Sequence, residues 1–400
     1  MKYDLVFEGG GAKGGVLVGA YDLFAQQGNT HGRLMGTSAG AITAVLLAAG
    51  YTADEMLTTM AERENGQSVF NSFLAEPASF TKEDILTGAV GKVLEGVDFT
   101  LIPDFVEKQM DKGIAGALVK HEKFRHVYSF IERGGWYSAD NFVPWLERKL
   151  DSGSWAKGQR NYGKMTLAEF YQATEVDVSF IASDTWSQRI LVLNHRTAPK
   201  CSVAWAVRMS MNIPLLWQEV KWQKAWGSYR NRDISGHAIV DGGMLSNFPI
   251  ELFLSDERPV TKVMGPKQDN PVLGFLIDDA TRPAALSGSP FESLDLIKSN
   301  IRPGELQTVI RIQRLLNTMM TAHDKMVMDE FSHIVVNLPA GGFGVIEFDM
   351  SDDRREALVE SGRIAMRKFL ENQSNTSPFE SMNNWSENVD RIANKILSDL

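Results

Sequence analysis

The first 50 residues alternate between short apolar segments and helical segments, and this alternation most constrains the fold. Residues 3–7 have the composition of a buried strand, and residues 15–27 have helical apolar spacing that Gly28 ends. A second apolar strand at 31–35 and an Ala-rich helix at 43–49 follow. Strand, helix, strand and helix in so short a stretch predict a parallel β-α-β unit, and therefore an α/β fold with a mostly parallel central sheet.

The rest of the chain is predicted to extend this sheet. Residues 176–182 and 189–194 are predicted to form a hairpin, and residues 238–240 and 272–277 two further strands. Four more elements are predicted: helices at 201–211, 306–328 and 352–370, and a strand at 333–337.

The chain of 400 residues is predicted to form one elaborated domain, because it shows no internal repeat and no sharp change of composition. This catalytic domain is expected over residues 1–370, with a helical insertion at about 52–164 that serves as a cap facing the substrate. Residues 371–400 are predicted to be a polar tail that ends in a short amphipathic helix.

Composition and charge exclude several classes of protein. The net charge of −9 argues against nucleic acid as a partner, because phosphate binding needs a basic surface. The single cysteine, Cys201, excludes an intrachain disulfide and fits a reducing compartment. The chain runs from Met1 directly into a glycine turn, which leaves no room for a signal peptide, and no apolar run is long enough to span a membrane. We therefore expect a cytoplasmic protein that contacts a membrane only peripherally.

The glycine turn at residues 9–14, Gly-Gly-Gly-Ala-Lys-Gly, has three interpretations. A dinucleotide site needs an acidic residue at the end of the second strand, where residues 33–35 are Arg-Leu-Met. A Walker loop needs Ser or Thr after its lysine, whereas Lys13 is followed by glycine. In the favoured interpretation, the amides of Gly10 and Gly11 lie at the head of a helix and hold an oxyanion.

Residues 36–40, Gly-Thr-Ser-Ala-Gly, follow a predicted strand and precede a predicted helix. A Gly-x-Ser-x-Gly pentapeptide in that context places serine on a sharp turn, where Gly36 and Gly40 permit close approach of the backbone. Ser38 is therefore predicted to be a nucleophile, with a plain turn or helix-capping serine as the alternative.

Asp241 is the candidate base. It ends a predicted strand and is followed by Gly242 and Gly243, and ligands of α/β sheets bind at the carboxyl ends of parallel strands. A carboxylate within hydrogen-bond reach can accept the serine proton directly, and partial desolvation would increase its basicity. Histidines such as His237 and His323 lack the glycine-rich or loop context of a catalytic base.

The ordered motifs GGGAKG, GTSAG and DGG resemble those of the patatin-like phospholipase family, which uses a Ser–Asp dyad and no histidine. Residues 206–214 are similar to a further block of that family, although Met209 stands where a small residue is more usual. The resemblance covers about residues 3–250 and implies a three-layer α/β/α sandwich with Ser38 as nucleophile and Asp241 as base. It also implies an oxyanion loop of Gly9, Gly10, Gly11 and Gly14, with Lys13 at the loop's basic position.

We therefore predict a lipid acyl hydrolase of the phospholipase A or lysophospholipase type, acting through an acyl-enzyme without a metal or other cofactor. Some bacterial members of the family are defence or virulence effectors. The resemblance therefore also implies, as one option, that the protein is an effector whose activity is regulated. Two alternatives stay open: an α/β-hydrolase-type esterase with a Ser-Asp-His triad, using a histidine such as His323, and a non-catalytic lipid-binding protein.

The acyl-lipid substrate lies in a bilayer or micelle, so the protein needs an apolar contact surface, while the sequence does not predict an oligomeric state. Seven side chains are candidates for this surface, with core packing as the alternative: Phe70, Phe73, Leu74, Phe80, Trp217, Trp222 and Trp226.

Overall fold

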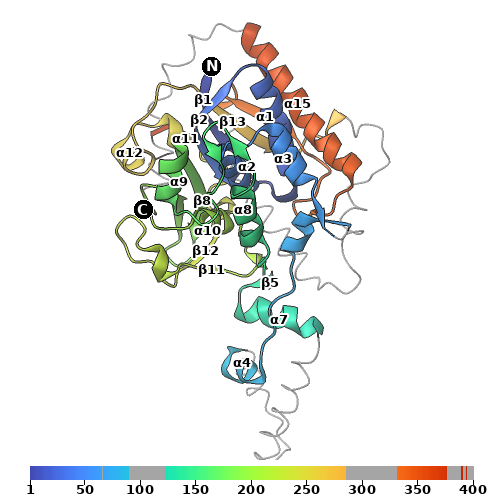
Figure 1. Ribbon diagram of the computed structural model, residues 1–400, viewed down its shortest axis with the longest axis vertical. Helices are drawn as coiled ribbons and strands as arrows, with labels where there is room; N and C mark the ends of the chain where they lie inside the picture. Colours follow the sequence, from blue (N-terminus) through green and yellow to red (C-terminus); the bar gives the residue numbers. More distant parts are fainter. Residues whose placement is uncertain (65, 90–121, 285–330, 376–388, 391–392, 394–400) are drawn as a thin grey trace, which may run out of the picture.

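The computed structural model describes residues 1–64, 66–89, 122–284, 331–375, 389–390 and 393. A large, mostly parallel sheet lies at the centre of these residues, with helices packed against it (Figure 1). The predicted α/β fold class is confirmed.

The parallel part of the sheet is built around β1 (Lys2–Phe7). β1 pairs with β2 (Thr30–Thr37) on one side and with β13 (Val272–Asp278) on the other. β14 (Val335–Pro339) pairs with β13, and β8 (Val178–Asp184) pairs with β2, and all of these pairs are parallel. Strands of this kind are covered on both faces, which explains why Leu5, Val6 and Phe7 of β1 are all apolar and buried.

The strand that carries Asp241 runs antiparallel to its neighbour, and not parallel as expected. β8 and β9 (Arg189–Leu193) form the predicted antiparallel hairpin. β12 (Ala238–Asp241) also runs antiparallel to β8, and the short β11 (Val220–Lys221) runs antiparallel to β12. The inference that Asp241 ends a parallel strand is therefore wrong, although the predicted strand itself is present.

The sheet separates two hydrophobic cores. Side chains alternate between the faces of a strand, so Leu5 and Phe7 enter one core while Val6 enters the other. The first core includes side chains of α1 (Gly15–Gln26) and α2 (Ala39–Ala48). The second includes side chains of α11 (Glu251–Leu254) and α12 (Arg258–Met264). Helix, sheet and helix thus form the three layers that the resemblance implies.

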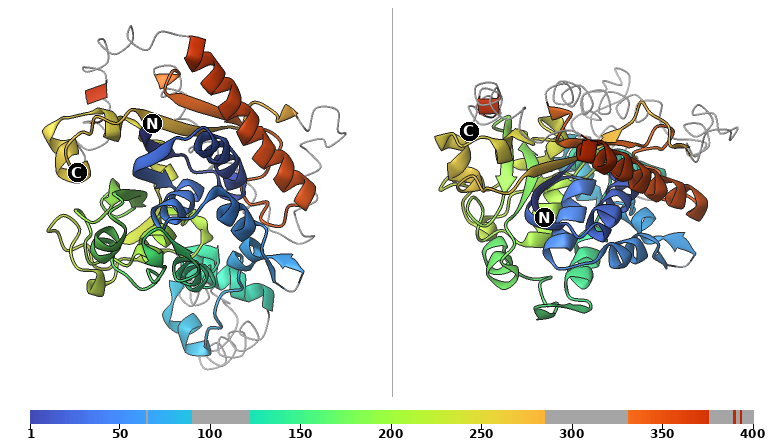
Figure 2. Two further views of the ribbon diagram at one scale, coloured as in Figure 1. Left: turned by 45° about the horizontal axis from the view of Figure 1, so that its top comes forward. Right: turned by 90° about the horizontal axis from the view of Figure 1, so that it is seen from above.

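Further helices complete the first layer. α15 (Asp352–Asn375) packs along α1 (Figure 2). An ion pair of 2.7 Å joins Arg363 Nε on α15 to Asp22 Oδ2 on α1. Three more helices are α3 (Ala53–Met60), α9 (Leu167–Thr174) and α10 (Val203–Ser210).

The predicted insertion contains short strands as well as helices. Its helices include α4 (Lys82–Thr87), α7 (Glu122–Glu132) and α8 (Phe142–Leu150), and Figure 1 shows α4 and α7 projecting below the body of the protein. β5 (Gly135–Tyr137) pairs in parallel with β10 (Leu215–Trp217), outside the insertion. The insertion is therefore joined to the residues just before β11.

Some predicted elements lie outside the described residues. These are the helix at 306–328 and most of the tail at 371–400, of which the structure describes the last turns of α15 and the residues 389–390 and 393. Val389 and Ala393 are buried in the second core. None of the helices in the described ranges is long and apolar enough to cross a membrane.

Candidate active site

Ser38 occupies a strained turn between β2 and α2. Its φ of 52° and ψ of −118° are unusual for a residue with a side chain, and such strain is common at functional sites. A Cβ at Gly36 would lie 2.2 Å from the Gly40 carbonyl oxygen, and one at Gly40 would lie 2.2 Å from the Phe7 carbonyl oxygen. Both positions therefore require glycine, as the elbow motif predicts, and the turn holds Ser38 buried at the end of the parallel strand.

Pairing with β8 brings Asp241 next to Ser38. Ile181 pairs with Thr37 of β2 and with Val192 of β9, so β2 and β9 lie on opposite sides of β8. Ala182 pairs with Asp241 of β12 and also with β9, so β12 lies on the same side of β8 as β2. β2 and β12 thus meet end to end, and Asp241 occupies the rung next to that of Thr37, the residue before Ser38.

Burial makes Asp241 an unusual carboxylate. Its side chain is fully buried, and burial raises its pKa to about 7, against the opposing effects of the Gly243 amide and the Ser38 hydroxyl. The Gly243 amide donates to Oδ1 at 2.8 Å. No hydrogen bond of normal geometry reaches Oδ2 from the described residues, so the Ser38 hydroxyl interacts with the carboxylate only weakly in this state. Such contacts often tighten only when substrate binds.

The glycine turn approaches the nucleophile closely. A Cβ at Gly9 would lie 2.9 Å from Ser38 Cβ, and Gly11 has a φ of +56°. Between the described residues, we find no hydrogen bond donated by the backbone amides of Gly9, Gly10 or Gly11. The turn continues through Gly14 into α1, so unpaired amides lie at the head of a helix and beside a serine. This arrangement can hold a developing negative charge.

Two buried polar side chains that the sequence argument missed support the glycine turn. Asn247 Nδ2 donates to Glu8 Oε1 and to the Gly9 carbonyl oxygen, both at 3.0 Å. Glu8 Oε2 in turn accepts a hydrogen bond from the Ile277 amide on β13. Glu8 directly precedes the turn and Asn247 follows the Asp-Gly-Gly motif, and this proximity in sequence was the available signal.

The block at 206–214 connects the two candidate catalytic residues. Ser210 Oγ accepts a hydrogen bond of 3.1 Å from the Ser38 amide, and the Asn212 carbonyl oxygen accepts one of 2.9 Å from the Asp241 amide. Arg208 Nη1 donates to Asn212 Oδ1 at 2.6 Å, and burial lowers the pKa of this arginine to about 10. The block therefore fixes the backbone on both sides of the site.

Lys13 is held by an acidic partner. Its Nζ lies 2.6 Å from Asp279 Oδ1, and the lysine side chain is buried while Asp279 is about half-exposed. Asp279 follows β13 and is not among the residues predicted from the sequence. Through this ion pair Lys13 fixes the glycine turn to the end of β13.

The hydrogen bonds of the described histidines involve neither Ser38 nor Asp241. The His31 ring is 3.3 Å from the Tyr21 hydroxyl, and burial lowers its pKa to about 4. His237 Nδ1 lies 2.7 Å from Asp184 Oδ2. No described histidine hydrogen-bonds to Ser38 or Asp241, and His323 lies outside the described residues. In the same part of the chain, no cluster of three or more His, Cys, Asp or Glu side chains could hold a metal ion.

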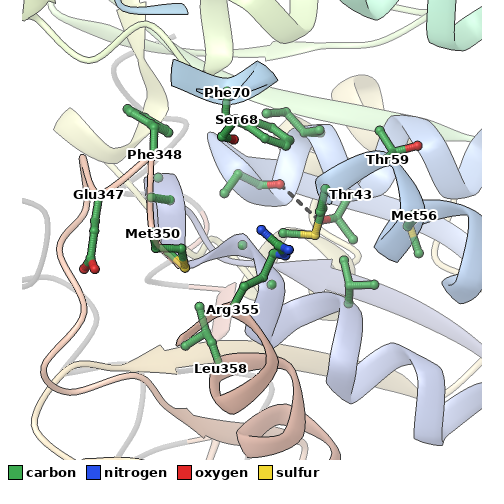
Figure 3. Close-up of a pocket in the computed structure, with 18 of the residues that line it drawn as sticks. Thr43, Met56, Thr59, Ser68, Phe70, Glu347, Phe348, Met350, Arg355 and Leu358 are labelled. Carbon is green, nitrogen blue, oxygen red and sulfur yellow. Dashed lines mark hydrogen bonds between the residues drawn. The ribbon is translucent and has the colours of Figure 1, made fainter. Parts of the chain in front are cut away.

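An apolar pocket of about 70 Å³ adjoins the glycine turn and the residue after Ser38 (Figure 3). Gly11, Gly14 and Ala39 line it on this side. Its polar lining includes Arg355, whose side chain points in among the other lining side chains drawn in Figure 3. Most of the other lining side chains are apolar: Val18, Ile42, Leu46, Met56, Met60, Phe70, Trp145, Phe348, Met350 and Leu358. The pocket has the character of a site for a hydrocarbon chain.

The aromatic residues suggested for membrane contact belong mainly to the core. Trp217, Trp222 and Trp226 are 1%, 2% and 6% exposed. Phe73 and Phe80 are also buried. The suggestion of an exposed contact surface at these five residues is therefore wrong, and the alternative of core packing is confirmed.

Comparison with known proteins agrees with this geometry. Residues 5–254 match the family described as "Patatin-like phospholipase". The chain belongs to this family. YqhO of Bacillus subtilis (strain 168) is 27% identical over 378 residues, which cover 92% of this chain and 98% of YqhO. Membership in the family supports lipid acyl hydrolase activity.

Two solved structures show weaker likeness. VipD from Legionella pneumophila is 17% identical with a TM-score of 0.45, over 92% of this chain and 67% of VipD. The type III effector ExoU is 14% identical with a TM-score of 0.37, over 94% of this chain and 54% of ExoU. The chain therefore spans about half the length of that effector.

Proposed function

We propose that the protein hydrolyses carboxylic esters of membrane lipids, as a phospholipase A or lysophospholipase, through Ser38 and Asp241. One observation carries the proposal: a serine on a strained elbow lies beside a buried carboxylate that lacks a strong partner at Oδ2. The pKa of about 7 lets this carboxylate act as a base near neutral pH.

The proposed reaction has two steps. Ser38 Oγ attacks the ester carbonyl carbon while Asp241 Oδ2 accepts the hydroxyl proton, and the amides of Gly10 and Gly11 hold the oxyanion. The tetrahedral intermediate collapses to an acyl-serine, and the leaving alcohol takes the proton from Asp241. A water molecule then gives a proton to Asp241 and attacks the acyl-serine, which releases the fatty acid and returns the proton to Ser38.

The apolar pocket is the proposed site for the acyl chain. It begins at the glycine turn and at Ala39, next to the nucleophile, and apolar side chains line most of it. Arg355 and Leu358 of α15 belong to its lining together with Ile42 of α2, so the end of the predicted catalytic domain contributes to the same site as its beginning. This supports a single catalytic unit over residues 1–370.

Hydrolysis of a soluble nitrophenyl acyl ester tests the proposal. We expect Ser38→Ala to lower kcat by at least about 10³-fold and to abolish labelling by a fluorophosphonate probe. Ser246→Ala is the matched control, because Ser246 is also buried and its hydroxyl has no hydrogen-bond partner among the described residues. Wild-type activity in Ser38→Ala would overturn the proposal.

The same assay separates the alternatives. Loss of activity in His323→Ala, with the fold intact, would favour a Ser-Asp-His triad. A wild-type protein that binds lipid but neither hydrolyses the ester nor reacts with the probe would be a lipid-binding protein.

A further inference from the structure

The turn between β8 and β9 lies at the same end of the sheet as the proposed dyad. Ser38 follows the last residue of β2, which pairs with Ile181, and Asp184 lies three residues further along β8. The turn therefore projects beyond the dyad by about 10 Å along the strand direction, at about 3.3 Å per residue. β12 begins opposite this turn, where the Thr185 amide donates to the Ala238 carbonyl oxygen at 3.1 Å. The segment before β12 thus lies at the same end.

Trp186 is the large apolar side chain on this turn, and it is 72% exposed. Its ring stacks on His237, with ring centroids 5.3 Å apart. His237 is held in turn by Asp184, whose carboxylate also accepts hydrogen bonds from the Ser187 hydroxyl and from the Trp186 amide. An exposed indole is therefore fixed in position by a polar network around the buried Asp184 rather than left on a loose loop.

Arginines lie near His237, the residue on which the tryptophan stacks. Arg189, Arg230 and Arg232 line a surface cavity of about 240 Å³ together with His237. Arg230 and Asn231 both have positive φ, 49° and 64°, in a two-residue turn closed by hydrogen bonds between the backbones of Tyr229 and Arg232.

The three arginines of this cavity outnumber its two carboxylates, so its lining has a net positive charge. Within the described ranges, neither Arg230 nor Arg232 forms an ion pair. The acidic groups at the cavity are Asp184, which is occupied by the network described above, and Asp233, which accepts hydrogen bonds from Ser235.

We infer that Trp186, Arg189, Arg230, Arg232 and His237, here called the basic tip, dock the protein on a bilayer that contains anionic phospholipids. The guanidinium groups match lipid phosphates, and a fixed, exposed indole suits the boundary between head groups and acyl chains. The chain as a whole carries a net charge of −9, so long-range attraction cannot supply this contact and a local basic surface is required.

The inference rests on the proposed function and adds how the protein is oriented on the bilayer. The basic tip lies at the sheet end where Ser38 and Asp241 meet, so docking through the tip turns that end toward the bilayer. The basic tip also takes the place of the membrane-contact surface that was predicted at Trp217, Trp222 and Trp226, which are buried.

Co-sedimentation with vesicles tests the inference. The Ser38→Ala protein is used so that the vesicles stay intact, with phosphatidylcholine alone or mixed with phosphatidylglycerol. We expect binding to the mixed vesicles, sensitive to salt, and weak binding to phosphatidylcholine. Each basic residue near an anionic bilayer increases the partitioning of the protein onto that bilayer about fivefold. The double variant R230Q/R232Q is therefore expected to lower binding by about 25-fold. Trp186→Ala lowers binding to the mixed vesicles as well.

The matched control is R367Q/K368Q, which removes the same charge from exposed positions on α15. This helix packs on α1 and β14, away from the basic tip. Unchanged binding in both R230Q/R232Q and Trp186→Ala, or an equal loss in the control, overturns the inference.

Soluble-ester hydrolysis separates docking from catalysis. With Ser38 restored, R230Q/R232Q should hydrolyse the nitrophenyl ester at the wild-type rate, and a parallel loss of this activity would also overturn docking. A wild-type protein that binds the mixed vesicles through the basic tip but fails to hydrolyse the soluble ester would refute the proposed function and support the docking surface.

Discussion

Two buried aspartates on adjacent strands, Asp241 and Asp184, have opposite environments. Asp184 accepts hydrogen bonds from two backbone amides, from the Ser187 hydroxyl and from His237. Asp241 accepts one from the Gly243 amide and interacts weakly with the Ser38 hydroxyl. Burial is nearly the same for both, at 1% and 0% exposed. The number of hydrogen bonds, and not burial, distinguishes a structural carboxylate from one that is available as a base.

The comparison also shows why residue types alone mislead. Ser187, Asp184 and His237 are the three residue types of a catalytic triad, and they lie together beside the turn between β8 and β9. The serine and the histidine both bond to the aspartate, whereas in a triad the histidine lies between the other two. This cluster therefore builds the basic tip and does not activate a nucleophile.

The largest expected effect is the loss of activity on removing the Asp241 charge. We expect Asp241→Asn to lower kcat for the nitrophenyl ester by about 10³-fold or more, because the amide cannot accept the serine proton. Asp184→Asn should change kcat by less than about threefold, because Asp184 takes no part in the proposed reaction. Equal losses in the two variants would remove the functional distinction between the aspartates.

The pH dependence of the reaction should follow Asp241. The base must be deprotonated, and burial raises its pKa to about 7, so kcat/KM should rise about tenfold per pH unit up to about pH 7 and then level off. The soluble ester should be used, so that lipid charge does not titrate. A profile that is already level at pH 5 would show that Asp241 is not the base in its described environment.

The two aspartates should affect stability in opposite directions. The pKa of Asp241 is raised on folding, so the folded state binds more protons than the unfolded state between about pH 4 and 7, and stability falls as pH rises through this range. Asp241→Asn should therefore raise Tm at pH 8. Asp184→Asn should lower the free energy of unfolding by about 2 kcal/mol, because it weakens hydrogen bonds to a charged acceptor. Thermal unfolding of both variants measures this, and a lower Tm for Asp241→Asn would contradict it.

The smallest expected effect concerns support of the glycine turn. Asn247→Ala removes the hydrogen bonds to Glu8 and to the Gly9 carbonyl oxygen. We expect kcat to fall about fivefold with little change in KM, because the neutral hydrogen bond to the Gly9 carbonyl oxygen is worth about 1 kcal/mol and the turn acts on the oxyanion. A change in KM alone, measured with the soluble ester, would assign Asn247 to substrate binding.

Local patterns in the sequence predicted much of the fold. The apolar strands, the amphipathic helices and the glycines of the elbow depend on residues close together in the chain, and the structure places β1, α1, β2 and α2 where these patterns indicate. The elbow geometry at Ser38 follows from Gly36 and Gly40, since the backbone contacts there exclude a Cβ. The hairpin of β8 and β9 was also predictable, because its strands are adjacent in sequence.

Contacts between distant residues were not predictable in the same way. The antiparallel direction of β12, the link from Ser210 to the Ser38 amide and the pairing of Lys13 with Asp279 each join segments far apart in the chain. Trp222 is buried and Trp186 is exposed, although both are tryptophans with the same intrinsic tendency to be buried. Packing therefore decides which of them lies at the surface.

The sequence by itself determined the α/β class, the glycine turn, the elbow and the candidate residues Ser38 and Asp241, because these depend on local backbone geometry and on residue type. Only the tertiary structure decided that β2 and β12 meet end to end on β8, that Asp241 is buried without a strong partner at Oδ2, and that Trp186 is the exposed tryptophan at that end of the sheet. Desolvation and strand pairing are properties of the packed chain, and both arise from residues that the sequence keeps far apart.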